Sequence, residues 1–459
     1  MKLFKFCGKS TKNQFIATGI VNLLAFSHGL GLGWSSPAVQ YFASKSTHLK
    51  GGPSSPSELS WIGASITLGA LIGTILAGSF ANCMGKKRTL MILALPNFGF
   101  WVLTYFAISV KEIIIGRFIG GITGGGIFRI LSLYIADIAE NNIRGGLGSI
   151  FPLVMYTGML IMFIMGSYIN YFVVSGLSAI IPILAYFLMF RLPETPHFLI
   201  QRNKFDEAIK SLKFYRTCHA ESSVEEIKKV EDEFEMMKIA IQNANSENVQ
   251  WKDFMTKKAK KGMTFGIFLV FLLAFSGNTV IMQYTAFIFG ITGSSLPPNE
   301  ASIIIAAMQV IGILIMGLLV DRIGRRKLMI ISCIGSTIAL TLMAIYLCCT
   351  ETWTGLGGAW ISVFLLTQII LFNSLGISTL LFVMCVEIVP FKIREYFALI
   401  SMIFVSVFMF ITLKAFPQTA VALGLSTCFW FFASICGIGV FILFFFMPET
   451  MGKDLLADQ

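Results

Sequence analysis

The amino-acid sequence predicts an all-α membrane protein with twelve transmembrane helices in two pseudo-symmetric six-helix bundles, accompanied by short cytoplasmic helices. The composition argues against a soluble fold, because 56% of the 459 residues are hydrophobic and only 13% are charged, about half the charged fraction of soluble domains. The mean hydropathy is +0.78. Apolar runs long enough to cross a bilayer can be drawn twelve times, and one set of charged motifs occurs once in each half of the chain.

The apolar runs place six spans in each half. The first six are expected near residues 14–36, 59–81, 89–110, 113–136, 146–169 and 172–192, and the second six near 263–289, 301–320, 328–349, 359–386, 396–417 and 424–447. They divide the chain into an N-terminal bundle (1–192), a linker (193–262), a C-terminal bundle (263–447) and a tail (448–459). Residues 1–12 lack the apolar segment and cleavage site of a signal peptide, so we expect the first span to act as the insertion signal.

Charged motifs recur in the same order in the two halves. The first half contains Gly85-Lys86-Lys87, then Asp137 and Arg144, then Pro193-Glu194-Thr195-Pro196; the second contains Asp321-Arg322-Ile323-Gly324-Arg325-Arg326, then Glu387 and Arg394, then Pro448-Glu449-Thr450. In both halves the acid precedes its arginine by seven residues. Duplicated bundles that move about a central path are typical of secondary transporters.

Basic residues indicate how the spans are oriented. The net charge is +11, and a twelve-span arrangement gathers most basic residues on one side: the N-terminal lysines, Lys86, Lys87, Arg88, Arg325, Arg326, Lys327, Lys392, Arg394 and those of 202–261. Only Lys45, Lys50 and Lys111 are expected near the other surface. The positive-inside rule then places both termini and the linker in the cytoplasm. The basic excess requires no nucleic-acid partner.

The linker has a helical pattern. Apolar residues recur at three- and four-residue steps from Phe205 to Leu212, and Ser223 with Glu226 forms a capping box before a second such run. We expect short amphipathic helices beneath the bundles that tether the halves, with a regulatory partner surface as the alternative.

Several function classes are disfavoured. Most of the nine cysteines lie in or beside spans, and no close Cys/His cluster resembles a zinc site. The chain contains no Gly-x4-Gly-Lys-Ser/Thr loop for ATP phosphates. We therefore expect no metal, no cofactor and no enzymatic activity.

These motifs together resemble a known family. Gly116-Arg117, Asp137 to Arg144 followed by Gly145-Gly146-Leu147-Gly148-Ser149, Pro193 to Pro196, Asp321 to Arg326, Glu387 to Arg394 and Pro448 to Gly452 are similar to the sugar porters of the major facilitator superfamily. Trp34-Ser35-Ser36-Pro37 and Thr412-Leu413-Lys414-Ala415-Phe416-Pro417 most resemble its insect facilitated trehalose transporter branch. The resemblance spans nearly the whole chain and implies a saccharide as the solute.

The duplicated charges are predicted to form a cytoplasmic gate. The gate residues are Asp137, Arg144, Arg117, Asp321, Arg325, Arg326, Glu387, Arg394, Glu194 and Glu449. Acid and arginine at the helix ends are expected to pair across the two halves through charge-assisted hydrogen bonds and to close the cytoplasmic mouth. The alternative is that they only anchor helix ends at the membrane interface.

The resemblance implies a substrate site that this chain fills in an unusual way. Aligned on Ser276-Gly277, the glutamine positions of the family's seventh helix hold Leu273 and Ala274, and its asparagine position holds Thr279. The remaining candidate ligands are Thr279, Gln309, Asn278, Gln283, Tyr284, Ser374 and Trp34. For Gln309 a helix-packing role stays open, and Tyr284 is either an outer gate or an interfacial tyrosine.

Three further polar residues lie within spans. Arg129 is about 12 Å inside its helix end by helical rise and either binds an anionic solute or joins the network of Asp137. Lys414 is expected to snorkel to water, and His28 to bond a neighbouring helix. Proton-coupled relatives carry an acid where this chain has Ser35, so the resemblance implies facilitated diffusion.

The sequence thus predicts a monomeric plasma-membrane uniporter that moves a sugar, trehalose or another saccharide, by alternating access. Two alternatives stay open: a solute sensor with a transporter fold that does not transport, and a carrier of a less polar solute.

Overall fold

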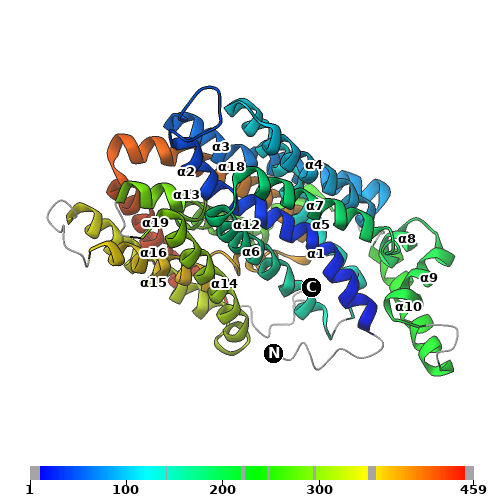
Figure 1. Cartoon of the computed structure of the whole chain (residues 1–459). Coiled ribbons are helices and arrows are strands. Elements are labelled where there is room, and N and C mark those ends of the chain that lie inside the picture. Colours follow the sequence, from blue (N-terminus) through cyan, green and yellow to red (C-terminus); the bar gives the residue numbers. More distant parts are fainter. Residues whose placement is uncertain are drawn as a thin grey trace.

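The computed structural model describes residues 11–140, 142–218, 223–244, 249–292, 296–349 and 358–449, and their regular secondary structure is helical throughout (Figure 1). Eleven of the described helices are long and apolar enough to cross a membrane, and a shorter apolar helix supplies the twelfth span. The predicted all-α membrane fold is confirmed. The tail beyond residue 449 and the first ten residues lie outside the described residues.

The N-terminal half contains seven helices that form six spans. They are α1 (Lys12–Gly33), α2 (Ser35–Ala43), α3 (Pro56–Met84), α4 (Lys86–Phe106), α5 (Val110–Ile138), α6 (Arg144–Tyr168) and α7 (Tyr171–Met189). The linker contributes α8 (Pro196–Gln201), α9 (Phe205–Tyr215), α10 (Val224–Ala244) and α11 (Trp251–Phe254). Helices α8 to α10 lie beyond one end of the bundle (Figure 1). We call this the linker end, and the opposite end, with the loop between α2 and α3, the far end.

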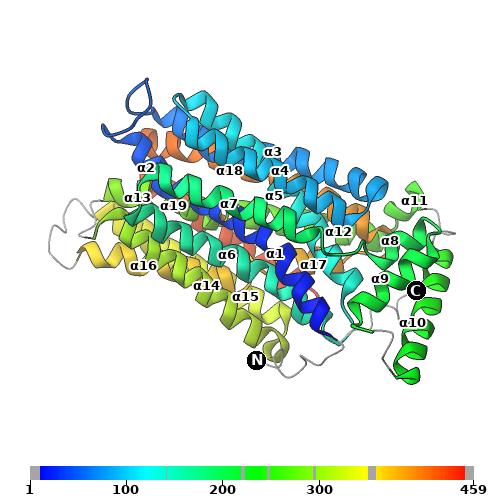
Figure 2. The ribbon, with the colours of Figure 1, turned by 45° about the vertical axis from the view of Figure 1, so that its right-hand side comes forward.

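The C-terminal half repeats the six-span plan with two interruptions. Its helices are α12 (Lys257–Phe275), α13 (Asn278–Thr292), α14 (Pro298–Ile323), α15 (Arg325–Cys349), α16 (Gly358–Leu375), α17 (Leu381–Glu387), the 3-10 helix η3 (Phe391–Ile393), α18 (Arg394–Leu423) and α19 (Leu425–Phe446). Figure 2 shows these long helices side by side with those of the first half.

Two matching positions of the halves share the same local backbone, whereas the first spans differ. The first span of the second half is broken at Ser276-Gly277, where Gly277 has a φ of 82°, but the first span of the first half continues through Trp34, whose φ of −56° and ψ of −29° are helical. Gly85 and Gly324 each join the second span to the third with a positive φ, 99° and 89°, which glycine adopts without strain. The sequence repeat is therefore also a repeat of structure.

The tenth span differs from the continuous helix expected over 359–386. The chain leaves the helix after Leu375 and turns through 376–380 before α17 begins. Side-chain hydroxyls stabilise the turn, because Ser378 and Thr379 donate to the carbonyl oxygens of Asn373 and Ser374 at 3.1 and 2.9 Å. Serine and threonine hydroxyls compete with helical backbone bonds in this way.

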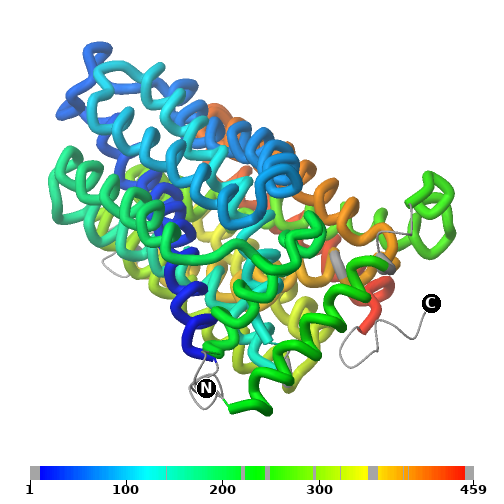
Figure 3. Tube along the Cα trace, turned by 90° about the vertical axis from the view of Figure 1, so that its right-hand side faces the viewer, coloured from blue at the N-terminus to red at the C-terminus, as the bar shows by residue number. Residues whose placement is uncertain are grey.

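The buried core joins the two halves at the far end and separates them at the linker end. One apolar cluster contains far-end residues of the first half, such as Trp34 and Met162, together with Tyr284 and most of the buried C-terminal half. A second cluster holds the linker-end residues of the first half with Tyr215 of the linker, and its members among the described residues include none from the C-terminal half. Figure 3 shows the blue and cyan helices of the first half beside the yellow and orange helices of the second.

Close packing of α3 on α5 depends on glycine. A Cβ atom at Gly121 would overlap the carbonyl oxygen of Ile66, and one at Gly125 would overlap that of Ala70. Small residues permit this approach of helix backbones inside membranes.

We predict that Gly121→Ala destabilises the protein by at least about 2 kcal/mol, because the added methyl group forces α3 away from α5. The matched control is Gly148→Ala in α6, where an added Cβ meets nothing within 4 Å. Thermal unfolding in detergent checks this: the first variant should melt well below the wild type and the control at or above it. Equal melting of the two variants would contradict the packing argument.

Candidate functional site

Arg117 is the buried cation at the junction of the two halves. Its side chain is 0% exposed, and its guanidinium donates to the carbonyl oxygens of Gly31 in α1 and Ile62 in α3 at 2.7 and 3.1 Å. A third bond, of 3.3 Å, goes to Oε1 of Gln283 in α13 of the other half, and the guanidinium carbon lies 5.6 Å from the centre of the Trp34 ring. We call this group the far-end seam.

The structure places Arg117 apart from the other predicted gate residues. Helix α5 begins at Val110 at the far end and reaches the linker end near Asp137, so Arg117 lies two turns from the far end. Its hydrogen-bond partners among the described residues are two backbone carbonyls and a side-chain amide. Arg117 therefore belongs to the closure of the opposite end.

Tyr284 extends the far-end seam toward α18. Its backbone is non-helical (φ −119°, ψ 20°), and its hydroxyl donates to the carbonyl oxygen of Leu413 at 3.0 Å. A Cβ atom at Gly63 of α3 would overlap that hydroxyl, so the ring fills the space between the halves. Beside it, the backbone N–H of Ala286 donates to the hydroxyl of Ser36 in α2 at 3.0 Å.

Lys414 joins the two halves near the far end. Its Nζ donates to the hydroxyl of Ser60 in α3 at 2.8 Å and lies 4.2 Å from the centre of the Trp61 ring. A cation over an indole face is an attractive arrangement. The side chain is half-buried, and snorkelling of its ammonium to water stays a prediction.

Several buried polar atoms of the spans lack a hydrogen-bond partner among the described residues. They include both amide atoms of Gln309, Oδ1 of Asn278, Oγ of Ser35 and Oδ1 of Asn373. Gln309 lies in α14 and is 0% exposed. Asn278 begins α13 after the break in the seventh span, and Asn373 precedes the break in the tenth span. Buried polar atoms normally have partners, so a set without them marks a place for a ligand or water.

The other candidate ligands differ in how far their polar groups are engaged. Oε1 of Gln283 accepts from Arg117, and the Tyr284 hydroxyl donates to the carbonyl oxygen of Leu413. Ser374 donates to the carbonyl oxygen of Ile370 in its own helix at 2.6 Å. Thr279 is half-buried beside Asn278. Ser35 and Asn373 were not predicted; the polar run Asn373-Ser374 inside an apolar span was the signal for the second.

At the linker end, the described ion pairs of each half join helices of that half. Lys86 Nζ, at the start of α4, lies 2.6 Å from Oδ2 of Asp137, at the end of α5. Arg325, at the start of α15, pairs in the same way with Glu387, at the end of α17. Gly85 and Gly324 direct these two helix starts toward their acids.

Two further predicted gate residues, Glu194 and Glu449, lie beside the same two glycine turns. Glu194 accepts from the backbone N–H groups of Lys87 and Arg88 at 2.9 and 3.3 Å, and a Cβ at Gly324 would lie 2.9 Å from Oε2 of Glu449. The following residues complete the set: Arg326 donates to the Phe444 carbonyl oxygen at 2.7 Å, Arg394 lies within electrostatic range of Glu387, Arg144 is exposed, and the Asp321 side chain lies outside the described residues.

The expected pairing of Asp137 and Glu387 with arginines of the opposite half is therefore not what the described contacts show. Asp137 bonds a lysine of its own half, and Glu387 bonds an arginine of its own half. The reason is local: the glycine turns bring a cation of the same half to each acid. Across the halves, the charge of Glu395 acts on Arg129, which donates to the carbonyl oxygen of Thr74 at 2.8 Å.

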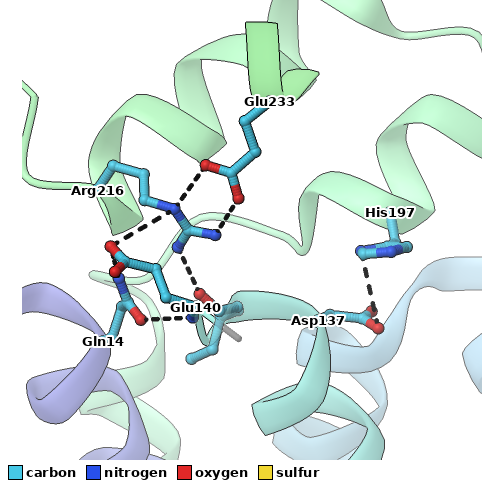
Figure 4. Close-up of polar contacts among 7 residues, drawn as sticks. Gln14, Asp137, Glu140, His197, Arg216 and Glu233 are labelled. Carbon is cyan, nitrogen blue, oxygen red and sulfur yellow. Dashed lines mark hydrogen bonds and ion pairs between the residues drawn. The ribbon is translucent and has the colours of Figure 1, made fainter. Parts of the chain in front are cut away.

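The linker helices are bound to the N-terminal half by Arg216, which follows α9 (Figure 4). Two of its nitrogens donate to the Glu233 carboxylate of α10 at 2.9 and 2.6 Å, and a third donates to the carbonyl oxygen of Ile138 at 2.8 Å. Glu140 lies 3.8 Å from the same guanidinium and accepts from Gln14 of α1 at 3.2 Å. A bidentate arginine pair of this kind fixes orientation, so α9 and α10 are held against α1 and α5.

His197 of α8 adds a titratable group to the Asp137 cluster. Its Nδ1 lies 3.9 Å from Oδ1 of Asp137 (Figure 4). Burial lowers the pKa of His197 below its ordinary value; Asp137 opposes this, while the nearby Lys86 and Arg144 add to it. The folded protein therefore favours neutral His197.

We predict that acidification destabilises the fold through His197. Because its pKa is lower in the folded than in the unfolded protein, the unfolded protein binds more protons, and the contribution is present above the unfolded pKa and lost as pH falls below about 6.5. Thermal unfolding from pH 7.5 to 5.5 should show a steeper loss for the wild type than for His197→Gln. Parallel curves for the two proteins would rule out this role.

Comparisons with known proteins agree with this architecture. A family model described as "Sugar (and other) transporter" matches residues 18–457. The facilitated trehalose transporter Tret1 of Bombyx mori is 30% identical over 446 residues, 96% of this chain and 85% of that protein. The Tret1 of Polypedilum vanderplanki is 29% identical over 443 residues, which make up 96% of this chain and 86% of that protein. The chain spans half the length of the Drosophila mojavensis Tret1, to which it is 28% identical.

Solved structures of the xylose transporter XylE from E. coli share the fold. The inward-open form has a TM-score of 0.79 at 19% identity, over 96% of this chain and 98% of that one. The partially occluded inward-open form has a TM-score of 0.77 at 18% identity, over 96% and 100%. The chain therefore belongs to the sugar transporter family of the major facilitator superfamily, and it is an integral membrane transporter rather than an enzyme.

Proposed function

We propose that the chain is a uniporter that carries a neutral saccharide, with trehalose as the first candidate, down its gradient across the plasma membrane. The trehalose transporters among its relatives support this substrate. The chain works as a monomer, with both termini and the linker end on the cytoplasmic side. The basic residues of α4, α15 and the linker lie at that end, in agreement with the positive-inside rule.

The observation that carries the proposal is the set of unpartnered buried polar atoms. Gln309, Asn278 and Asn373 together offer amide donors and acceptors, and two of them lie beside helix breaks. Saccharide hydroxyls both donate and accept, so such a solute satisfies these groups. Transporter sites are typically built at broken helices between repeats.

The contacts across the halves support a state that is closed at the far end. The far-end seam ties α1, α3 and α13 together, whereas the linker-end acids bond cations of their own half. We infer that in the opposite state Asp137 and Glu387 exchange these partners for arginines across the halves. Arg144 is exposed at the start of α6 in the N-terminal half. It is the arginine that we propose as the partner of Glu387 in that state.

The proposal of uniport rests on Ser35 in the first span. Its hydroxyl is buried, and it has no titratable proton near neutral pH. The family resemblance places the acid of proton-coupled relatives at this position, so the serine supports transport without a proton. Leu273 and Ala274 are also buried, and their apolar side chains favour a solute with fewer hydroxyls as the second candidate.

We predict that Gln309→Ala lowers the apparent affinity for trehalose about fivefold or more in reconstituted vesicles, because one or two hydrogen bonds of about 1 kcal/mol each are lost. The matched control is Thr367→Val in α16, whose buried hydroxyl bonds only carbonyl oxygens of its own helix. Uptake of radiolabelled trehalose and glucose is measured with and without a proton gradient.

Saturable uptake that is independent of the proton gradient supports uniport. Uptake driven by the gradient would contradict it. Tight trehalose binding with no uptake would identify a sensor, and uptake limited to less polar solutes would identify the second candidate.

A further inference from the structure

The far end contains a pocket apart from the unpartnered amides of Gln309 and Asn278. It has a volume of about 390 Å³ and lies between α2, the end of α6, the start of α7 and the start of α14. We call it the far-end pocket. Its lining residues include Trp34 at the junction of α1 and α2, Gln40 and Tyr41 from α2, Asn170 and Tyr171 at the start of α7, and Asn299 from the C-terminal half. Gln309 and Asn278 do not line it.

Polar side chains from both halves line the far-end pocket. They include Gln40 and Asn170 of the N-terminal half and Asn299 of the C-terminal half. Side-chain amides both donate and accept hydrogen bonds, so these residues suit a ligand with several hydroxyl groups.

Rigid aromatic rings form the wall of the far-end pocket. Tyr41 and Tyr171 stack with their centres 5.4 Å apart. Their hydroxyls are held elsewhere, by Nδ1 of His48 at 3.1 Å and by the carbonyl oxygen of Thr104 at 2.9 Å. The rings therefore present apolar surface, and pockets that bind small molecules combine such surface with a few fixed polar groups.

Among the described residues, the side chains that line the far-end pocket are all uncharged. Burial of an anionic or cationic ligand against them would leave its charge unpaired, which is costly. The chemistry fits a neutral molecule with several hydroxyl groups and a carbon skeleton. The volume of about 390 Å³ falls in the range of small-molecule sites, about 300 to 1,000 Å³.

We propose that the far-end pocket is a second saccharide site, separate from the unpartnered groups at the helix breaks. This rests on the proposed saccharide function only for the choice of ligand. Asn299 belongs to the C-terminal half and the other lining residues to the N-terminal half. A saccharide bound between them holds the far ends together, so binding favours the state closed at that end.

The test is calorimetric titration of the full chain in phosphatidylcholine nanodiscs with trehalose. The wild type should bind two molecules per chain. Gln40→Ala combined with Asn299→Ala should weaken one site about tenfold, as expected for two lost hydrogen bonds, and leave the other unchanged. Gln309→Ala should weaken the other site instead. Lys45→Ala, an exposed neighbour that does not line the pocket, is the matched control.

Two further titrations distinguish a free neutral saccharide from a charged sugar and from a lipid headgroup. Glucose 6-phosphate should not bind the far-end pocket. Nanodiscs that contain a neutral glycolipid should compete with trehalose there only if a lipid headgroup is the natural occupant. Melting temperatures of the variants check that each is folded.

One trehalose per chain, unaffected by the Gln40 and Asn299 substitutions but weakened by Gln309→Ala, would overturn the second site and leave the proposed function standing. If the wild type binds two trehalose molecules but takes up none, the result would contradict transport and leave the second site standing. No binding to the wild type would overturn the second site.

Discussion

The buried guanidinium of Arg117 is the interaction on which the closed far end depends. A cation inside a membrane protein is expensive unless its donors are met, and here carbonyl oxygens of α1 and α3 and an amide of α13 meet them. The partner in α13 belongs to the other half. Separation of the halves at the far end therefore removes a hydrogen bond from a buried charge. At the same time Lys414 loses its hydrogen bond to Ser60 of α3, and the Tyr284 ring loses its packing against Gly63 of α3.

At the linker end, Asp137 and Glu387 pair with cations of their own half. Each half neutralises its own acid through a glycine turn that brings a cation to the end of the helix carrying Asp137 or Glu387. Arg216 then fastens α9 and α10 to the N-terminal half. Because these contacts are internal to a half, they leave the halves free to rotate as bodies. A repeated internal architecture with an interface that differs at its two ends is what alternating access requires.

The sequence predicted what depends on composition and local pattern. Hydropathy located the spans, and the repeated charges identified the two halves. The break at 376–380 was missed because it depends on hydroxyl bonds within the turn. The separation of Arg117 from the other predicted gate residues was not predicted, because its motif was grouped with charges from the other end of the same helix. The contact of Lys414 with Ser60 and Trp61 was not predicted, because these residues lie far away in the sequence. Which buried amides stay unpartnered depends on the packing of all twelve spans.

The most direct test measures distances between the halves by electron spin resonance, with label pairs at Lys45 and Leu423 for the far end and at Ser149 and Arg322 for the linker end, all exposed positions. Arg117→Gln should lengthen the far-end distances and shorten the linker-end ones. The matched control is Arg129→Gln in the same helix, since Arg129 bonds Thr74 within its own half, and it should keep the far end closed. Unchanged far-end distances in a folded Arg117→Gln protein would contradict the account.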